Sequence, residues 1–426
     1  MRKILHIDLN NFYASVECMN NPDLKGVPMA VCGNTELRHG IVLAKNNLAK
    51  SYGIKTGDVI WQAKNKCKSL VTVLPDFSLY LRFSMLARKI YEDYTDQIEP
   101  FGIDECWLDV TESEKLFGSA RDIAEIIRNR VKNELGLTVS IGVSFNKIYA
   151  KLGSDYKKPD AVTVIDEKNY KEIVYPLPVK QLLYVGSATN NKLSSIGITT
   201  IGDLAEAPIE LLKQKFGVVG KYLKEFASGK DDKPVKRMSS VSVVKSVGNS
   251  ITTTRDMCCF KDVEVVINML SDSVASRLRD YNLKANTVSI YIKSSELNSK
   301  SFQCKMEYNC SSTEIAQFAM KLFRTNYKEP FKLRSLGVKA SGLKEFSELY
   351  VQLDIFDVDR IRKQENLEKT MDKIRSRFGY NSIKKGIIKL DEDLTEFANP
   401  KEEHIIHPIS FLKGKRWLAD ICWSDC

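Results

Sequence analysis

Apolar positions along the first 165 residues recur with the two periods that separate strands from helices. Short apolar or alternating runs predict strands at residues 3–8, 27–32, 40–44, 103–110 and 138–143. A spacing of three to four predicts helices at residues 12–18, 63–67, 80–95 and 120–134. Apart from residues 11–76, and with residues 97–111 divided by a Pro/Gly turn, the order is strand, helix, strand, strand, helix, strand. We therefore expect an α+β fold with a ferredoxin-like sheet, into which residues 11–76 are inserted.

The pattern becomes helical with short loops over residues 167–230. Two stretches there, 185–204 and 216–221, resemble helix-hairpin-helix turns, which offer backbone N–H groups to a DNA phosphate. Glycine-closed helix ends in an ordinary bundle fit the same residues. Residues 231–240 are charged, contain a proline and lack periodicity, so we interpret them as a linker.

A second α+β unit follows the linker. Its pattern predicts helices at 262–281 and 313–326, and strands near 286–294, 301–307 and 333–340. The remaining residues, 343–426, are polar, with one helical stretch at 358–376. We interpret 343–426 as a C-terminal tail.

Composition places the chain among globular proteins: of its 426 residues, 43% are apolar and 28% are charged. No apolar run approaches the roughly 18 residues that a membrane span requires, and the first residues are too short for a signal peptide. Ten cysteines without a C-x-x-C pair, together with only four histidines, disfavour a zinc site. Cys422 and Cys426 are the pair that could cooperate. We expect a cytoplasmic protein with reduced cysteines.

The net charge of +10 permits nucleic-acid binding. Residues 241–342 hold 15 Lys and Arg against 9 Asp and Glu, a net charge of +6 on a quarter of the chain. This segment is a candidate for phosphate contacts. A merely solvated basic surface is the alternative.

Two groups of carboxylates are the candidates for chemistry. Asp8 ends the first predicted strand, and Asp104 and Glu105 lie beside a turn in another. If these strands pair, the three carboxylates meet at one edge of the sheet, although adjacent strand residues point to opposite faces unless a bulge or twist intervenes. Carboxylates suit Mg²⁺, and two such ions about 3.5–4 Å apart can activate a hydroxyl and stabilise a leaving pyrophosphate. A solvated turn is the alternative, but the apolar run from Ile103 to Leu108 favours metal ligation.

Three stretches in the same order resemble the motifs of the Y-family DNA polymerases, in particular their DinB/UmuC-like bacterial branch. They are His-Ile-Asp8-Leu-Asn-Asn-Phe-Tyr13, Ile103-Asp-Glu-Cys-Trp-Leu-Asp-Val-Thr111, and residues 140–151 followed by Lys157-Lys-Pro159. The resemblance runs to about Phe356. It implies a low-fidelity, template-directed enzyme for translesion synthesis, which adds dNTPs to a primer 3′-hydroxyl with two Mg²⁺ ions. The partners it implies are primer–template DNA and dNTP, and we expect a monomer.

The resemblance also implies the domains and the roles of single residues. The palm is residues 1–10 and 77–165, the fingers 11–76, the thumb 166–230, the linker 231–240, and the DNA-binding little finger 241–342. Asp8, Asp104 and Glu105 match the catalytic metal ligands, and the backbone carbonyl of Leu9 matches one as well. Tyr13 matches the steric gate that excludes a ribose 2′-hydroxyl, with Phe12 beside it in the nucleotide site. Lys158 matches a lysine on the triphosphate.

The fingers depart from the family pattern. Asn47 and Lys50 stand where the family commonly has a Tyr and an Arg on the incoming triphosphate. Both can still contact phosphate, although bidentate geometry is lost, and Lys45 is a candidate to compensate. Ile41 and Leu43 match positions that cover the nascent base pair and are often smaller. Nucleotide affinity and the range of lesions are the properties that these departures affect.

A pentapeptide near the end of the matched region resembles the motif by which bacterial polymerases bind the sliding clamp, the β subunit of the replicase. It consists of Gln352, Leu353, Asp354, Ile355 and Phe356. Leu353 and Phe356 would be apolar anchors. The alternative is a strand fragment in the protein core.

Two other functions fit parts of the sequence. A catalytically weak DNA-binding accessory protein would share the fold, but the complete carboxylate set argues against it. A nucleotide cyclase would share the palm, but it has no use for hairpin turns, a basic second unit or a clamp peptide. The chain has no G-x-x-x-x-G-K-[ST] phosphate loop and no evident exonuclease carboxylates, which disfavours ATP-driven and proofreading roles.

Overall fold

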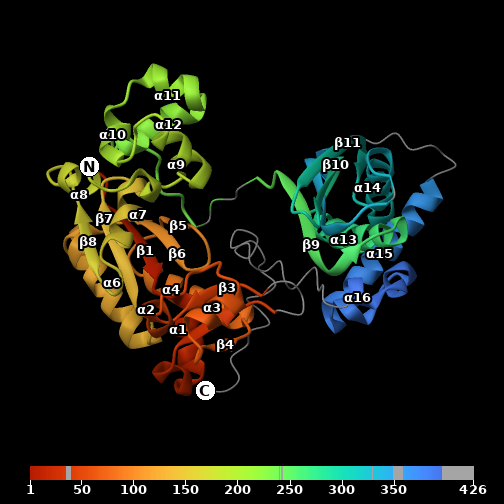
Figure 1. Cartoon of the computed structure of the whole chain (residues 1–426), viewed down its shortest axis with the longest axis horizontal. Coiled ribbons are helices and arrows are strands. Elements are labelled where there is room, and N and C mark those ends of the chain that lie inside the picture. Colours follow the sequence, from red (N-terminus) through yellow and green to blue (C-terminus); the bar gives the residue numbers. More distant parts are fainter. Residues whose placement is uncertain (35–39, 239, 241–242, 329, 349–357, 396–426) are drawn as a thin grey trace. The chain divides into compact units, whose positions relative to one another are not determined.

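The computed structural model describes the chain except residues 35–39, 239, 241–242, 329, 349–357 and 396–426. Two compact units are present, one built on residues 1–32 and 42–238 and the other on residues 243–395 (Figure 1). None of the helices in the described part is both long and apolar enough to cross a membrane.

The first unit is centred on a five-stranded sheet with the order β5-β6-β1-β7-β8. These strands are Ile98–Pro100, Glu105–Asp109, Ile4–Leu9, Val139–Ser144 and Val162–Ile165. The central strand β1 pairs antiparallel with both β6 and β7, β5 pairs antiparallel with β6, and β8 adds parallel to β7. The first four strands therefore have the ferredoxin-like arrangement that the order of elements predicted.

Helices in the connections between these strands pack on one another and on the sheet. α4 (Phe77–Glu92) packs on α6 (Ala120–Leu135), and α6 packs on β7, while α5 (Glu114–Phe117) is a single turn. α7 (Lys147–Tyr156) lies closely against β7, β1 and β8. A Cβ atom at Gly142 of β7 would lie 1.9 Å from the carbonyl oxygen of Ala150, so only glycine allows this approach. The close packing fixes the side chains of α7 over β1.

The inserted residues form a small layer of their own. Strands β3 (Val42–Lys45), β2 (Met29–Cys32) and β4 (Val71–Val73) form a three-stranded sheet, of which β4 was not predicted. Around it lie α1, η1, α2 and α3, which span Phe12–Asn20, Pro22–Gly26, Asn47–Ser51 and Ile60–Lys66.

Residues 167–230 are helical, as predicted. The elements are α8 (Tyr170–Val174), η2 (Val179–Gln181), α9 (Ser187–Ser194), α10 (Ile201–Glu206), α11 (Ile209–Phe216) and α12 (Val218–Ala227). Gly217 alone joins α11 to α12, with φ 61° and ψ −140°, a conformation that favours glycine. This glycine fits both the hairpin turn and the glycine-closed helix end that the sequence left open, and Val218 and Val219 are exposed beside it.

The predicted linker has no helix or strand over residues 230–236, but it packs against the five-stranded sheet. Val235 is buried with Ile4, Trp107 and Ala150, and the backbone N–H of Lys236 donates to Glu99 Oε2 at 3.0 Å. The burial of Val235 thus anchors the linker, which the sequence pattern showed only as a charged segment without periodicity.

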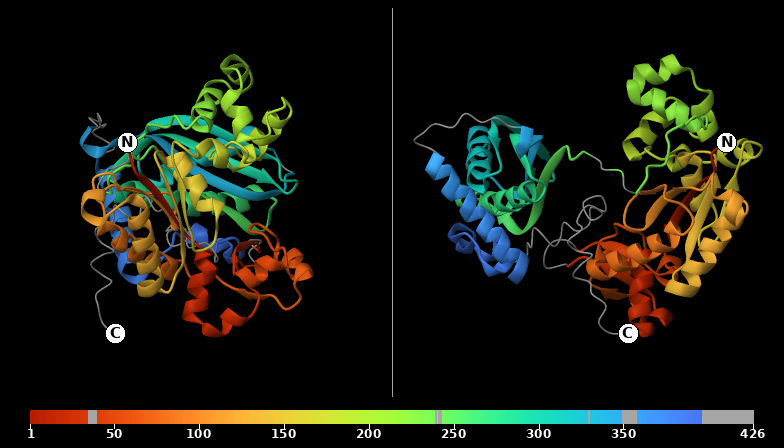
Figure 2. Two further views of the ribbon diagram at one scale, coloured as in Figure 1. Left: turned by 90° about the vertical axis from the view of Figure 1, so that its left-hand side faces the viewer. Right: turned by 180° about the vertical axis from the view of Figure 1, so that it is seen from behind.

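The second unit is a four-stranded antiparallel sheet with the order β11-β10-β12-β9, and α13 and α14 cover one of its faces (Figures 1 and 2). The strands are Ser299–Asn309, Leu283–Ser294, Leu333–Glu345 and Ser246–Met257, and the helices are Phe260–Asp280 and Ser312–Asn326. All were predicted except β9. This strand is rich in Ser and Thr, so its pairing with β12 supplies an order that its own pattern does not show.

The C-terminal part of the chain corrects the interpretation of 343–426 as a polar tail. After η3 (Phe346–Glu348), α15 (Val358–Phe378), η4 (Tyr380–Ser382), η5 (Gly386–Leu390) and α16 (Glu392–Thr395) are folded parts of the second unit. Ile388 and Leu394 lie in its core, and Arg375 Nη1 lies 2.7 Å from Asp272 Oδ2 of α13, with both side chains 2% exposed. Because some of its charges are paired with those of α13, the polar helix α15 can pack against the second unit. The polarity of the sequence therefore did not indicate that this part of the chain is folded.

Candidate active site

The pairing of β1 with β6 brings the predicted carboxylates together. Asp8 lies opposite Glu105 in the register of the two strands. Asp104 lies in the turn just before β6, where its carbonyl oxygen accepts a 3.1 Å hydrogen bond from the N–H of Leu9. Asp104 therefore lies outside the regular strand, where the pleat does not set the direction of its side chain. The strand pairing that the expectation required is present, and the charges of Asp8 and Glu105 act on Asp104.

Side chains of α4 hold that turn in place. Gly102 has φ 107°, in the region that glycine favours, and Arg88 Nη2 donates to its carbonyl oxygen at 2.9 Å. Ser84 donates to the carbonyl oxygen of Ile103. Two side-chain donors on a packed helix thus position the peptide units that lead into Asp104.

Burial and the neighbouring carboxylates disfavour the charged forms of Asp8 and Asp104. Burial raises the pKa of Asp104 to about 6, and the neighbouring charges of Asp8 and Glu105 add to this rise. Burial also raises the pKa of Asp8, although the ammonium of Lys158 opposes the rise. A site whose acids repel in this way gains stability from any cation that it binds.

Two lysines lie among these carboxylates. Lys158 Nζ is 2.7 Å from Asp8 Oδ2, and Lys151 Nζ is 2.7 Å from Glu105 Oε1 and 3.5 Å from Asp8 Oδ2. Burial alone would lower the pKa of either lysine, but the surrounding carboxylates outweigh burial and raise both pKa values. Lys158 was predicted as a site residue, whereas Lys151 was not singled out.

His6 is a second side chain of the site that sequence reasoning missed. It is fully buried, its Nδ1 lies 2.8 Å from Ser154 Oγ, and its Nε2 lies 3.4 Å from Glu105 Oε2. Burial and the charge of Lys151 lower its pKa well below 6.5, so the ring is neutral. The sequence did contain a signal for His6: side chains alternate along a strand, so residues 6 and 8 lie on the same face of β1.

The donor chemistry fits a hard divalent cation, since three mutually repelling carboxylates offer only oxygen ligands. Within the described residues, however, no three His, Cys, Asp or Glu side chains are arranged as a closed metal cluster. The ammonium groups of Lys151 and Lys158 lie at the carboxylate oxygens instead.

Tyr13 lies in the first turn of α1, close to the carboxylates. Its ring stacks on Tyr80 with centroids 4.2 Å apart and planes 10° apart, and it meets the edge of Phe77. Burial raises the pKa of Tyr13 to about 12, and the charge of Asp104 contributes. Phe12, by contrast, is buried. The half-buried Tyr13 is thus the better placed of the two to meet a ligand.

The predicted fingers residues lie on and beside α2. Asn47 accepts a 2.9 Å hydrogen bond from Asn11 Nδ2, next to α1, and Lys50 is exposed. Lys45 Nζ donates to Thr56 Oγ1 at 3.2 Å, and burial together with the charge of Lys50 lowers its pKa. Ile41 is 41% exposed and Leu43 is half-buried.

Comparison of the sequence with known protein families identifies the family of this chain. The impB/mucB/samB family matches residues 7–155, and the C-terminal domain of the same family matches residues 244–355. This chain belongs to the impB/mucB/samB family.

Curated relatives of this impB/mucB/samB protein match over nearly their whole length. A DNA polymerase IV of Acetivibrio thermocellus is 50% identical over 395 residues, which cover 92% of this chain and 99% of the relative. A DNA polymerase IV of Clostridium acetobutylicum is 35% identical with the same two coverages. A solved Y-family DNA polymerase chimera, 25% identical, superposes with a TM-score of 0.71 over 80% of this chain and 99% of its own. The fold is therefore that of a Y-family polymerase, as the sequence motifs predicted.

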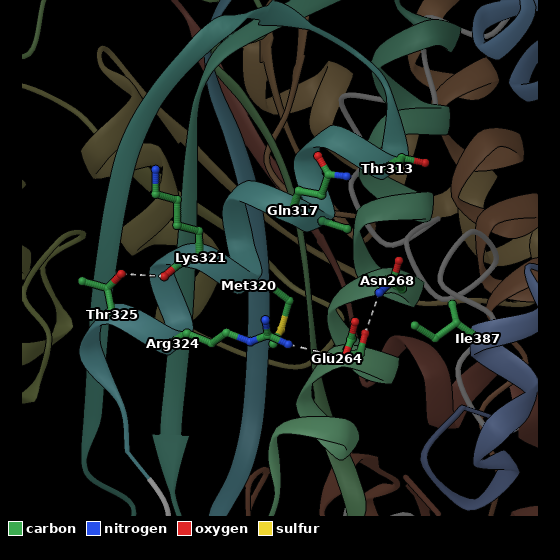
Figure 3. Close-up of a pocket in the computed structure, with 10 residues that line it drawn as sticks. Glu264, Asn268, Thr313, Gln317, Met320, Lys321, Arg324, Thr325 and Ile387 are labelled. Carbon is green, nitrogen blue, oxygen red and sulfur yellow. Dashed lines mark hydrogen bonds and ion pairs between the residues drawn. The ribbon is translucent and has the colours of Figure 1, made fainter. Parts of the chain in front are cut away.

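A groove of about 600 Å³ in the second unit of this family member lacks a group of carboxylates like that of the candidate active site (Figure 3). It lies between α13 and α14, and its one acidic lining residue among those described, Glu264, faces Arg324 at 3.7 Å. A single paired carboxylate cannot hold two metal ions, so the groove is not a rival active site.

Two groups of predictions remain outside these observations. The pentapeptide Gln352 to Phe356 lies outside the described residues, as do Cys422 and Cys426. The eight described cysteines are all free.

Proposed function

We propose that this protein extends a DNA primer along a template, past damaged bases, by two-metal nucleotidyl transfer on Asp8, Asp104 and Glu105. The enzyme class follows from the family and the fold: it is a DNA-directed DNA polymerase that uses primer–template DNA and dNTP. The pairing of Asp8 with Glu105 across β1 and β6 is the observation that carries the chemistry. A non-catalytic accessory protein would have no reason to keep three carboxylates at this cost in mutual repulsion.

The proposed ligands for two Mg²⁺ ions are the three carboxylates and the backbone carbonyl of Leu9. Bound there, the ions would supply an activated 3′-hydroxyl and a stabilised pyrophosphate. Lys158 lies in a position to exchange its contact with Asp8 for the triphosphate, because its backbone follows the last turn of α7. Lys45, Asn47 and Lys50 are further triphosphate candidates.

The outer face of the second sheet is the proposed DNA grip. Val288 and Ile290 of β10 are buried under the helices, so Ser289 and Tyr291 point to the opposite face. The exposed lysines Lys305 and Lys339 lie on that face too, across from β10. Ammonium groups on an open sheet face suit phosphates, whereas a nucleotide cyclase has no need of such a surface.

Primer extension tests the proposed activity directly. We expect the purified protein to extend a primer on undamaged and damaged templates with Mg²⁺, and to lose this activity completely in excess chelator. Restored Mg²⁺ should restore extension. Extension that continues in the chelator would contradict the metal mechanism, and binding of primer–template without extension under any divalent cation would favour the accessory-protein alternative.

We also propose that residues 352–356 bind the sliding clamp. Described elements lie before and after the segment in the sequence: β12 and η3 precede it, and α15, which packs on the second unit, follows it. In this proposal, these elements reduce the conformational entropy that binding costs, compared with a free tail. Tethering to a clamp would raise the local concentration of the enzyme at the primer.

Replacing Gln352, Leu353 and Phe356 together by Ala should abolish clamp binding and clamp-stimulated synthesis, because two apolar anchors worth about 1.5–3 kcal/mol each are lost. Extension without the clamp should stay within about twofold of the original. Surface plasmon resonance against the clamp and a paired extension assay measure both. Unchanged clamp binding, or an insoluble variant, would show that these side chains have another role.

A further inference from the structure

Three carboxylates surround the ammonium group of Lys151, a residue to which the proposed mechanism gives no role. Its Nζ lies 2.7 Å from Glu105 Oε1, 3.5 Å from Asp8 Oδ2 and 3.5 Å from Asp155 Oδ2, and its side chain is 14% exposed. A buried ammonium in this position offsets part of the negative charge of the site.

Lys151 is the one lysine within 4 Å of Glu105 in the described part of the chain. His6 is the other basic side chain within that distance, with its Nε2 3.4 Å from Glu105 Oε2. The ring of His6 is fully buried, and its Nδ1 lies 2.8 Å from Ser154 Oγ. Lys151, at 2.7 Å, is therefore the nearest cationic group to Glu105.

The backbone of Lys151 is also fixed. It lies in the middle of α7, which approaches β7 so closely that only glycine fits at position 142. Lys158 lies beyond the end of that helix. The ammonium of Lys151 is thus held at the carboxylates by a rigid element, whereas that of Lys158 is carried on a loop.

We propose that Lys151 is a positioning residue, a permanent internal counter-charge that holds Glu105 beside Asp8, to which Lys158 also pairs, when no divalent cation is bound. The proposal rests on the proposed metal site. The same charge must weaken the binding of a divalent cation, because like charges a few ångströms apart repel strongly in a partly buried site. Lys151 would therefore stabilise the metal-free enzyme and lower its metal affinity.

The test compares Lys151→Met with Lys157→Met in the full-length protein. Lys157 is exposed at the end of the same helix. Its replacement by Met therefore removes the same charge from the chain at a position outside the site. We expect Lys151→Met to lower the melting temperature in chelator by several degrees, and to bind Mn²⁺ about tenfold more tightly or better, as measured by electron paramagnetic resonance. Lys157→Met should change neither quantity, and Lys151→Arg should stay close to the original protein.

A purely structural role would lower the melting temperature without tightening Mn²⁺ binding, and that result would overturn the proposal, as would equal behaviour of the two Met variants. If Lys151→Met is insoluble, the double variant Lys151→Met/Glu105→Gln decides. Removing the carboxylate that lost its partner should restore soluble protein, and failure to do so would show that Lys151 acts by packing. Absence of Mn²⁺ binding in the original protein as well would contradict the metal site, and the proposal with it, whereas Mn²⁺ binding in the original protein that Lys151→Met does not tighten would contradict the proposal alone.

Discussion

Primer extension should fall by at least about a thousandfold when Glu105 is replaced by Gln or Asp104 by Asn. Each change keeps the shape of the side chain and removes one negative charge from a site in which three carboxylates converge. Because these charges would act on the metal ions in the transition state, the binding of primer–template should change by less than about threefold. Single-turnover extension and fluorescence anisotropy separate the two quantities.

Glu112→Gln is the matched control for the carboxylate variants. Glu112 follows the far end of β6, is exposed, and pairs only with Lys115 at 3.6 Å among the described contacts. We expect this variant to extend primers at the original rate. If Glu105→Gln or Asp104→Asn also kept near-original activity, the assignment of the active site to this edge of the sheet would be wrong.

Discrimination against ribonucleotides should fall by about 10- to 100-fold in Tyr13→Ala. The ring of Tyr13 stacks on Tyr80 and meets Phe77 in an edge-to-face contact, and Tyr80 is itself fixed by a hydrogen bond to Glu17. A ring that cannot move aside makes a 2′-hydroxyl clash, and overpacking of this kind costs about 1–3 kcal/mol, with a tenfold effect for each 1.4 kcal/mol. The ratio of kcat/KM for dNTP and rNTP measures this directly.

Tyr13→Phe separates the ring from the hydroxyl group in this experiment. It keeps the stacked ring and should keep the preference for deoxynucleotides. An unchanged preference in Tyr13→Ala would move the gate to another residue. Phe12 was the next candidate from the sequence, but its burial means that the backbone of α1 would have to shift for it to serve.

Local patterns in the sequence predicted the elements whose order is set within one stretch of chain. The strand at 3–8 appears as β1 (Ile4–Leu9), and the helix at 120–134 appears as α6, which begins with a capping box of Ser119 and Asp122. Their order was enough to indicate the ferredoxin-like sheet, because few topologies connect such elements without crossing. The positions of Asp8, Asp104 and Glu105 on that sheet then followed from strand pairing.

Contacts between distant parts of the chain decided the rest. β9 carries too few apolar residues to be recognised alone, and it becomes a strand because β12 supplies its hydrogen bonds. α15 looks like a solvated helix until Arg279 and Asp272 of α13 meet its charges in the interior. The linker shows no apolar periodicity, since Val235 is its one buried apolar side chain among the described residues.

The sequence by itself thus determined the family, the sheet and the identity of the acidic residues, because motif and period are local properties of the chain. Only the tertiary structure decided how those acids are held and neutralised. Lys151 and His6 lie in ordinary helix and strand positions, and nothing in their sequence neighbourhood shows that both contact Glu105. The charge balance of the site depends on distances of a few ångströms between residues 46 and 99 positions apart along the chain, and folding alone sets those distances.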